Sequence, residues 1–202
     1  MSESRAIIPL PPSPELTTTA SAQDVEALVA QINALDGRVG TLEAEAFEDK
    51  ISLLVFSGDM DKLMAAFLVA TGAAAMGTEV SMFFTFWGLS AVKKKRVFKG
   101  KGFFEKVLAF MLPKGPKAVP TSNMNMAGIG PKFFNFMMNK KNITSLPELI
   151  ELAVELEVGM YGCQMSMDVM GIHREELLDE LEICGVAGYL GQAHSARNQL
   201  FI

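Results

Sequence analysis

An almost continuous apolar segment from Lys50 to Phe56 most constrains what this chain can fold into. Apolar runs without alternation are typical of strands that are buried on both faces of a sheet. The run ends at the turn Ser57-Gly58-Asp59, where Asp59 is placed to cap a helix that extends to Met76. A second apolar strand follows at about residues 79–84, so the segment predicts a strand–helix–strand unit in a parallel sheet with a right-handed crossover.

Further along the chain, helix-like and strand-like patterns alternate. Alternation of this kind is typical of an α/β domain with an open, mostly parallel sheet, and we expect that domain to span residues 48–202. In chain order the sequence predicts an amphipathic helix at 103–112, a long loop at 113–131 with a short strand near 117–119, an amphipathic segment at 133–139, a helix at 147–157, a strand at 158–161, a helix at 173–180, a strand at 181–184 and a final helix at 186–197.

The first 47 residues differ in character from the rest of the chain. Residues 1–20 are rich in proline and threonine, and we expect a disordered tail there. Residues 21–47 predict a helix capped by Ser21, with apolar residues spaced three and four apart at Val25, Leu28, Ile32, Leu35, Val39 and Leu42. This seam is narrow and its flanking positions are polar, which favours an oligomerising coiled coil over a helix packed on its own domain.

The bulk composition restricts the function classes. Half of the 202 residues are apolar, and the net charge of −5 gives no overall basic balance, so we expect no nucleic-acid partner. With two cysteines and no secretory pattern from Met1 to Arg5, a reducing, cytoplasmic setting is expected. The longest uncharged run, Leu63 to Thr78, has 16 residues, which favours a buried helix over a membrane span of about 20 residues.

One local cluster of positive charge contrasts with the negative net charge of the whole chain. Six cations fall within the nine residues from Lys93 to Lys101. The plainer interpretation is a solvated segment, and the functional alternative is a docking site for an acidic partner or an anionic surface. Membrane association therefore stays open at this point but is not favoured.

The sequence gives no pattern for a cofactor or a metal. No glycine-rich phosphate-binding motif follows the first strand, and His173 and His194 are not at zinc-ligand spacing from the cysteines. Several methionines surround Cys163, and thioethers with a thiolate can hold Cu(I). Methionine more often fills an irregular core or lines an adaptable binding surface, so we expect neither a metal nor a cofactor.

Cys163 is the residue most suited to chemistry. It follows the short apolar run that begins at Val158, and it precedes residues that can open a helix. Open parallel sheets place ligand crevices at the carboxyl ends of their strands, and a helix N-terminus favours thiolate over thiol. The alternative is an inert buried cysteine.

Cys184 lies 21 residues after Cys163, so both thiols share one sheet edge if their strands are neighbours, where they could form a disulfide or exchange sulfur. Cys184 could equally be a simple core residue.

Four separated motifs resemble the DsrE/DsrF/DsrH-like superfamily, in the longer DsrE-like sulfurtransferase branch that is often labelled "peroxiredoxin family protein". The resemblance covers about Lys50 to Leu190 and rests on the following segments: Ser57-Gly58-Asp59-x-Asp61-Lys62, Ala73-Ala74-Ala75-Met76-Gly77, Phe83-Phe84-Thr85-Phe86-Trp87-Gly88-Leu89, and Cys163-Gln164-Met165-Ser166-Met167-Asp168-Val169-Met170-Gly171. It implies a three-layer, flavodoxin-like domain that forms homo-oligomers. It also implies a cysteine that accepts sulfane sulfur as a persulfide and exchanges it with partners such as rhodaneses and TusA-like carriers.

The motif cysteine of that family corresponds to Cys163, which we expect to be the sulfur-carrying residue. Cys184 is expected to be auxiliary, because relatives often have glycine at its position. The competing hypothesis is a non-catalytic oligomeric or membrane-associated module that binds through a methionine-rich face. Further auxiliary residues are expected at the ends of the first strand and around the motif cysteine: Ser57, Gly58, Asp59, Gln164, Met165 and Ser166.

Overall fold

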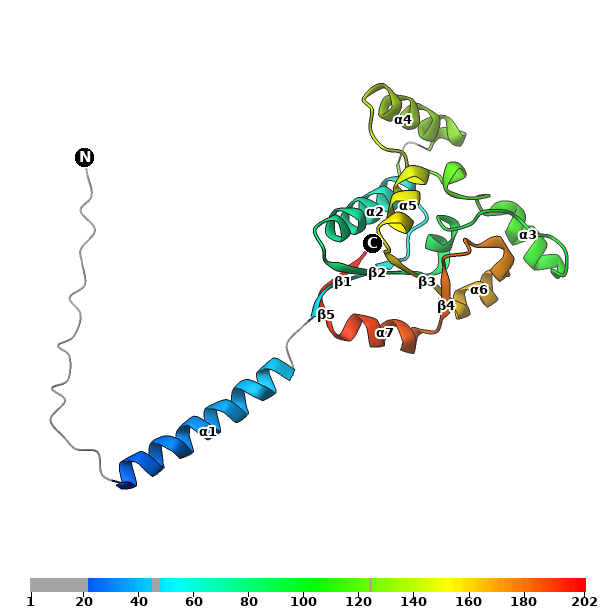
Figure 1. Ribbon diagram of the computed structural model, residues 1–202. Coiled ribbons are helices and arrows are strands. Elements are labelled where there is room, and N and C mark those ends of the chain that lie inside the picture. The colour runs from blue at the N-terminus through cyan, green and yellow to red at the C-terminus, as the bar shows by residue number, and fades with distance from the viewer. Residues whose placement is uncertain (1–21, 45–47, 124) are drawn as a thin grey trace, which may run out of the picture. The chain divides into compact units, whose positions relative to one another are not determined.

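The computed structural model describes residues 22–44, 48–123 and 125–202, and it divides into two compact units, Met1–Ala46 and Phe47–Ile202 (Figure 1). The described part of the first unit is one helix, α1 (Ala22–Ala44). The predicted disordered tail and the predicted cap at Ser21 lie outside the described residues. Five apolar side chains of the predicted seam are about half exposed on α1: Val25, Leu28, Ile32, Leu35 and Val39. Their role in self-association stays a prediction.

In the described part of the second unit, five parallel strands form one sheet in the order β4-β3-β2-β1-β5. The strands are β1 (Glu48–Val55), β2 (Glu79–Phe84), β3 (Gly159–Cys163), β4 (Glu182–Cys184) and β5 (Ala196–Phe201). Helices α2 (Met60–Ala75) and α5 (Leu146–Glu155) lie on one side of this sheet, and α6 (Gln164–Met170) and α7 (Val186–His194) lie on the other (Figure 1). The prediction of a three-layer α/β domain is confirmed.

The remaining elements connect β2 to β3 and β3 to β4. Two longer helices, α3 (Phe103–Met111) and α4 (Ile129–Lys140), lie between β2 and α5 in the chain. Four short 3-10 helices complete the described chain: η1 (Phe86–Ser90), η2 (Pro116–Ala118), η3 (Met126–Gly128) and η4 (Arg174–Glu176).

The main core lies between the sheet and the pair α2 and α5. Leu53 of β1 is fully buried there, and Phe67 of α2 stacks on Phe84 of β2 with ring centroids 5.9 Å apart. Leu149 lies on the buried, apolar face of α5. The long uncharged run of the sequence forms most of α2 and is thus part of this core. Among the described helices, none is long and apolar enough to cross a membrane.

The carboxyl end of β1 is in backbone contact with η1. The Gly88 N–H donates to the Phe56 carbonyl at 3.0 Å, and a Cβ added at Gly88 would meet the Val55 carbonyl oxygen at 2.2 Å. A Cβ at Gly58 would meet the Trp87 carbonyl oxygen at 2.7 Å. Glycine is therefore required at both positions for the turns after β1 and β2 to pack together.

Three sequence-based element predictions were wrong. The predicted final helix ends at His194, and the chain continues as β5, an edge strand whose residues after Ala196 are exposed and so carry no apolar alternation. The predicted helix at 173–180 is the single turn η4, because the Arg174 guanidinium binds the carbonyls of Leu178, Asp179 and Leu181 in a non-helical loop. The predicted strand near 117–119 is η2, flanked by prolines that cannot donate to a ladder.

The cationic segment is not uniformly solvated. The side chains of Lys93, Lys101 and Glu176 are fully buried, and both ammonium groups pair with the one carboxylate, Lys93 at 3.2 Å. Burial alone would raise the pKa of Glu176, but the hydrogen bonds from Lys101 and the His173 backbone, together with the Lys93 charge, hold that pKa below its ordinary value. Burial lowers the pKa of Lys93. This buried triad of Lys93, Lys101 and Glu176 links the segment that follows η1 to η4.

The contact between η1 and β1 predicts a large cost for Gly88→Ala. The new methyl group would overlap a backbone oxygen that cannot move aside, and we expect a loss of about 3 kcal/mol in the free energy of unfolding. The matched control is Gly72→Ala on α2, where an added Cβ meets nothing within 4 Å and should stabilise the helix by about 0.5–1 kcal/mol. Chemical denaturation measures both, and equal effects of the two changes would contradict the packing described.

The exposed seam of α1 predicts that deletion of residues 1–46 weakens self-association. The α/β unit should still fold, because its core begins beyond residue 47. Light scattering across a dilution series measures the mass, and circular dichroism checks the fold. An unchanged mass for the shortened chain would show that the seam of α1 does not hold copies together.

Candidate functional site at the ends of strands β3 and β4

Cys163 is the last residue of β3 and occupies the N-cap position of α6, with extended backbone angles (φ −72°, ψ 113°). The apolar run that begins at Val158 forms the strand, and Gly171 ends the seven-residue helix in the left-handed conformation. The Cys163 side chain is buried, with 1% of the residue exposed. The predicted position of this thiol at a strand end is confirmed.

The sheet register places Cys184 directly beside Cys163. The two residues are paired across β3 and β4, and two residues earlier Tyr161 is paired with Glu182. Register partners on adjacent parallel strands lie about 4.8 Å apart and direct their side chains to the same face. Both cysteines are free thiols, and Cys184 is the more exposed of the two. The structure therefore brings together the two thiols of the chain.

The face that carries the two thiols is the one covered by α7. Phe83, the register partner of Tyr161 on β2, stacks on Tyr189 of α7 with centroids 4.7 Å apart. A Cβ added at Gly188 would lie 3.5 Å from the Cys184 Sγ, so this sulfur lies against the first turn of α7. Burial, the neighbouring Cys163 and Glu182 raise the pKa of Cys184, and a hydrogen bond from the Tyr189 backbone N–H partly offsets this.

Helix α6 is fixed to the end of β2 by a buried pair of hydroxyl groups. The Ser166 and Thr85 oxygens lie 2.8 Å apart, and both side chains are buried. On the outer side of α6 the Gln164 amide donates to the Asp168 carboxylate at 2.8 Å, and Met165 is half exposed. Of the predicted auxiliary residues, Ser166 thus positions α6, whereas Gln164 and Met165 face outward.

The methionines around Cys163 do not form an exposed methionine-rich face. Met160, Met167 and Met170 belong to the buried core, and Met165 is exposed. Filling a core in this way is the ordinary structural use of this side chain. In the described part of the chain, no group of three or more His, Cys, Asp or Glu side chains is arranged to hold a metal ion.

Ser57, Gly58 and Asp59 lie at the end of β1, and β2 separates that strand from β3. Asp59 occupies the predicted N-cap position of α2, although its side chain makes no cap hydrogen bond. Its carboxylate instead accepts hydrogen bonds from Ser57 Oγ at 3.0 Å and Lys62 Nζ at 2.8 Å. These contacts close the turn after β1 and occupy the carboxylate.

The same turn lines a pocket of about 390 Å³. Cys163 is not among its lining residues, so the structure does not bring the Ser57-Gly58-Asp59 turn and the thiol pair into this one pocket. The lining residues are Phe56, Ser57, Gly58, Asp59, Lys62, Trp87, Ser90, Pro113 and Pro120.

Comparison with known proteins identifies the family. The sequence profile of the DsrE/DsrF/DrsH-like family matches residues 47–201, which is the whole α/β unit apart from its last residue. The chain belongs to this family. The match begins where α1 has ended, so α1 lies outside the family domain.

Two relatives in the family align with most of the α/β unit. The protein YrkE of Bacillus subtilis is 44% identical over 154 residues, which cover 76% of this chain and 96% of YrkE. The sulfur carrier protein DsrE2 of Allochromatium vinosum is 31% identical over 168 residues, which cover 77% of this chain and 99% of DsrE2. Among solved structures, the YchN protein of E. coli aligns over 76% of this chain and 98% of its own, with 13% identity and a TM-score of 0.48.

Two contacts of the site were missed by reasoning from sequence. Thr85 belongs to a motif that carried the family resemblance, but its pairing with Ser166 depends on β2 and β3 being neighbours. The Tyr189 N–H near Cys184 depends on where α7 begins. The available signal was the position of Thr85 at the carboxyl end of β2, on the same sheet edge as Cys163.

The buried hydroxyl pair predicts coupled effects of substitution. Ser166→Ala or Thr85→Val leaves one buried hydroxyl without its partner, which should reduce the free energy of unfolding by about 1–3 kcal/mol. The double variant leaves neither group unpaired and should lose clearly less than the sum. Urea denaturation of the four proteins measures this cycle, and strict additivity would show that the two hydroxyls do not depend on each other.

Proposed function

We propose that the protein carries sulfane sulfur as a persulfide on Cys163 and passes it to thiols of partner proteins. Membership of the DsrE/DsrF/DrsH-like family and the 31% identity to the sulfur carrier DsrE2 support a role in sulfur transfer. The observation that carries the proposal for Cys163 is its place at the carboxyl end of a central strand, next to a second free thiol.

The chemistry is two successive displacements at one sulfur atom. The Cys163 thiolate attacks the outer sulfur of a donor persulfide, the donor leaves as a thiolate, and Cys163 becomes a persulfide. An acceptor thiolate then attacks that outer sulfur, and Cys163 leaves as a thiolate. The transferred atom stays at the same oxidation state throughout, so neither step needs a metal, a redox cofactor or an external electron source.

The burial of Cys163 restricts how a donor reaches it. Because 1% of the residue is exposed, a large partner cannot contact the sulfur unless α6 or its neighbours move. Helix α6 has only seven residues and is held to β2 by the hydroxyl pair of Thr85 and Ser166. A protein whose persulfide is sheltered in this way loses less sulfur to small thiols and to water. Exchange of sulfur with partners such as rhodaneses and TusA-like carriers, and a homo-oligomeric state, are proposed on the family resemblance.

The proposal predicts a mass increase of the full-length chain after incubation with inorganic polysulfide. Each added sulfur atom contributes about 32 Da. Wild type should gain at least one, and the gain should disappear on reduction. Cys163→Ser should lose this stable adduct, because Cys184 has a raised pKa and little thiolate at neutral pH. Intact mass spectrometry measures the gain, and equal loading of Cys163→Ser and wild type would contradict the proposal.

A second candidate function is docking on an anionic lipid surface, and the charge distribution favours it. Residues 93–141 contain twelve Lys and Arg and a single acidic residue, Glu105, although the whole chain has a net charge of −5. The remaining residues are therefore strongly acidic. Lys93 and Lys101 are buried against Glu176, which leaves ten of the twelve cations for a surface. A cationic segment of this kind is attracted to anionic headgroups, by about 1 kcal/mol for each Lys or Arg near the surface.

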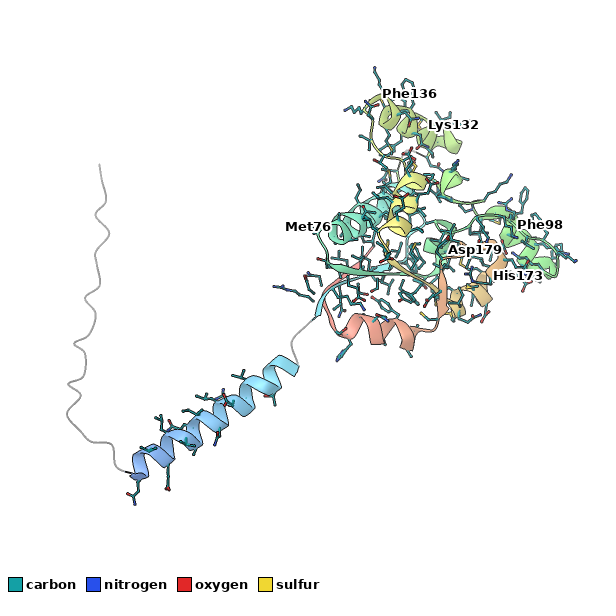
Figure 2. All side chains as sticks on the ribbon, viewed as in Figure 1. Met76, Phe98, Lys132, Phe136, His173 and Asp179 are labelled. Carbon is teal, nitrogen blue, oxygen red and sulfur yellow. The ribbon has the colours of Figure 1, made fainter. Side chains whose placement is uncertain are left out.

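The same segment exposes aromatic side chains on two helices. On α3, Phe103, Phe104 and Phe110 are 73–85% exposed, and on α4, Phe133 and Phe136 are about 60% exposed. Figure 2 shows Lys132 and Phe136 on α4 and Phe98 beside α3. Short helices with exposed aromatic faces and nearby lysines bind in the plane of a membrane interface without crossing it. The alternative of a non-catalytic module that binds through a methionine-rich face is less well supported, because three of the four methionines nearest Cys163 in the described chain are buried.

Vesicle sedimentation of the full-length protein tests this second candidate. Binding is expected to vesicles that contain phosphatidylserine, to be weak on pure phosphatidylcholine, and to decrease with salt because the attraction is screened. The double change Phe103→Ser and Phe104→Ser should weaken binding by about tenfold or more, because two exposed rings no longer enter the interface.

The matched control is Met76→Ser, which alters an apolar side chain that is 86% exposed but lies outside residues 93–141. It should leave vesicle binding unchanged. Equal binding to neutral and anionic vesicles, or equal losses in the two variants, would rule out docking through α3.

A further inference from the structure

We infer that Cys184 is a resolving thiol: its thiolate attacks the inner sulfur of the Cys163 persulfide, closes a Cys163–Cys184 disulfide and expels hydrosulfide. This inference rests on the proposed function, since it needs a persulfide on Cys163. It goes further by assigning a role to the second cysteine and a third state to the protein, besides the free thiol and the persulfide.

The register of β3 and β4 gives the geometry. Cys163 and Cys184 are direct partners in the ladder, on adjacent parallel strands. Neighbouring strands lie about 4.8 Å apart, and disulfides form when the two Cα atoms are about 4.4–6.8 Å apart. The partners direct their side chains to the same face, where the Cys184 Sγ lies against the first turn of α7. A bridge between them therefore needs rotation of side chains and no change in strand register.

The local backbone allows Cys184 to turn toward its partner. Cys184 is the last residue of β4, a strand of three residues, and Gly185 follows it at the N-cap of α7. Cys163, in contrast, is fixed between β3 and α6 and is buried. The attacking thiol is thus on the more adjustable element and the persulfide on the rigid one.

The reaction balances without an external oxidant. The Cys184 sulfur forms a bond to the Cys163 sulfur, and the bond between that sulfur and the outer sulfur breaks. The outer sulfur leaves with the electron pair as HS⁻, so the sulfane sulfur is reduced and the two cysteine sulfurs are oxidised to a disulfide. The reverse reaction, attack of HS⁻ on the disulfide at Cys163, regenerates the persulfide and the Cys184 thiol.

The protonation of Cys184 sets the pace of this closure. Burial, Cys163 and Glu182 raise the pKa of Cys184, so near neutral pH most of it is thiol and only a small fraction can attack. The persulfide accordingly persists long enough to meet an external acceptor. When no acceptor arrives, the protein closes into the disulfide and releases the sulfur as hydrosulfide.

The experiment follows one loaded sample over time under anaerobic conditions. Full-length wild type is incubated with inorganic polysulfide, excess reagent is removed, and intact mass and free sulfide are recorded together. The species that is about 32 Da heavier than the reduced chain should convert into one that is about 2 Da lighter, with release of one equivalent of sulfide. Wild type that was never loaded should not form the species that is about 2 Da lighter under the same conditions.

Trypsin identifies the bridge. Arg174 is the one cleavage site between the two cysteines, so the disulfide should join peptides 142–174 and 175–197, and reduction should separate them. Cys184→Ser should load as wild type does and then keep the heavier mass without releasing sulfide. Cys184→Ala, which removes the hydroxyl as well, should behave in the same way and checks that serine itself is not responsible.

The outcomes separate this inference from the proposed function. If neither wild type nor Cys184→Ser gains mass on Cys163, the proposed function fails. If both load and wild type then stays heavy at the same rate as Cys184→Ser, with no linked peptides, the resolving role is wrong and the carrier function stands. Linked peptides formed only after loading, and only with Cys184 present, are the result that the structure leads us to expect.

Discussion

The site depends on the parallel register of β2, β3 and β4, which brings three strand ends to one edge of the sheet. Through this register Cys163 is paired with Cys184, and through the adjacent pairing of β2 with β3 the Thr85 hydroxyl comes within 2.8 Å of Ser166. A shift of one residue would turn every side chain of a strand to the opposite face. The thiols would then no longer share the face under α7.

The rest of the unit holds this edge in place. The apolar side chains of α2 and α5 fix β1 and β2, and the contact of Gly88 with Val55 fixes the turn that carries Thr85. In the chain after α6, the buried Glu176 with its two lysines anchors the loop that leads into β4. Such a buried triad is costly to desolvate and is stable because the carboxylate is paired twice and also accepts a backbone hydrogen bond. The sulfur chemistry proposed for Cys163 therefore takes place between two anchored segments and one short, adjustable strand, β4.

Much of the fold could be predicted from local pattern, because β1, α2 and β2 are marked by long apolar runs and a sharp turn. The strand end at Cys163 could also be predicted, because a short apolar run from Val158 precedes it and residues that can open a helix follow it. What could not be predicted depended on long-range pairing. Strand β5 carries polar residues at 197–199 because it lies at an edge, and its place beside β1 follows from the return of the chain through α7. Similarly, no local feature of Lys93 or Lys101 reveals that both reach one carboxylate about 75 to 83 residues away. The sequence predicted that Cys163 and Cys184 lie close together only if their strands are neighbours, and in the sheet β3 and β4 are neighbours.

The proposed sulfur chemistry depends on the two thiols being neighbours, and a short bifunctional thiol reagent tests this most directly. Applied to the reduced, folded protein at low concentration, it should give one bridge that joins peptides 142–174 and 175–197 within a single chain. In denaturant, where the strands separate, the same reagent should give two independent adducts. Two independent adducts on the folded protein, with no linked peptides, would contradict the register and with it the shared site.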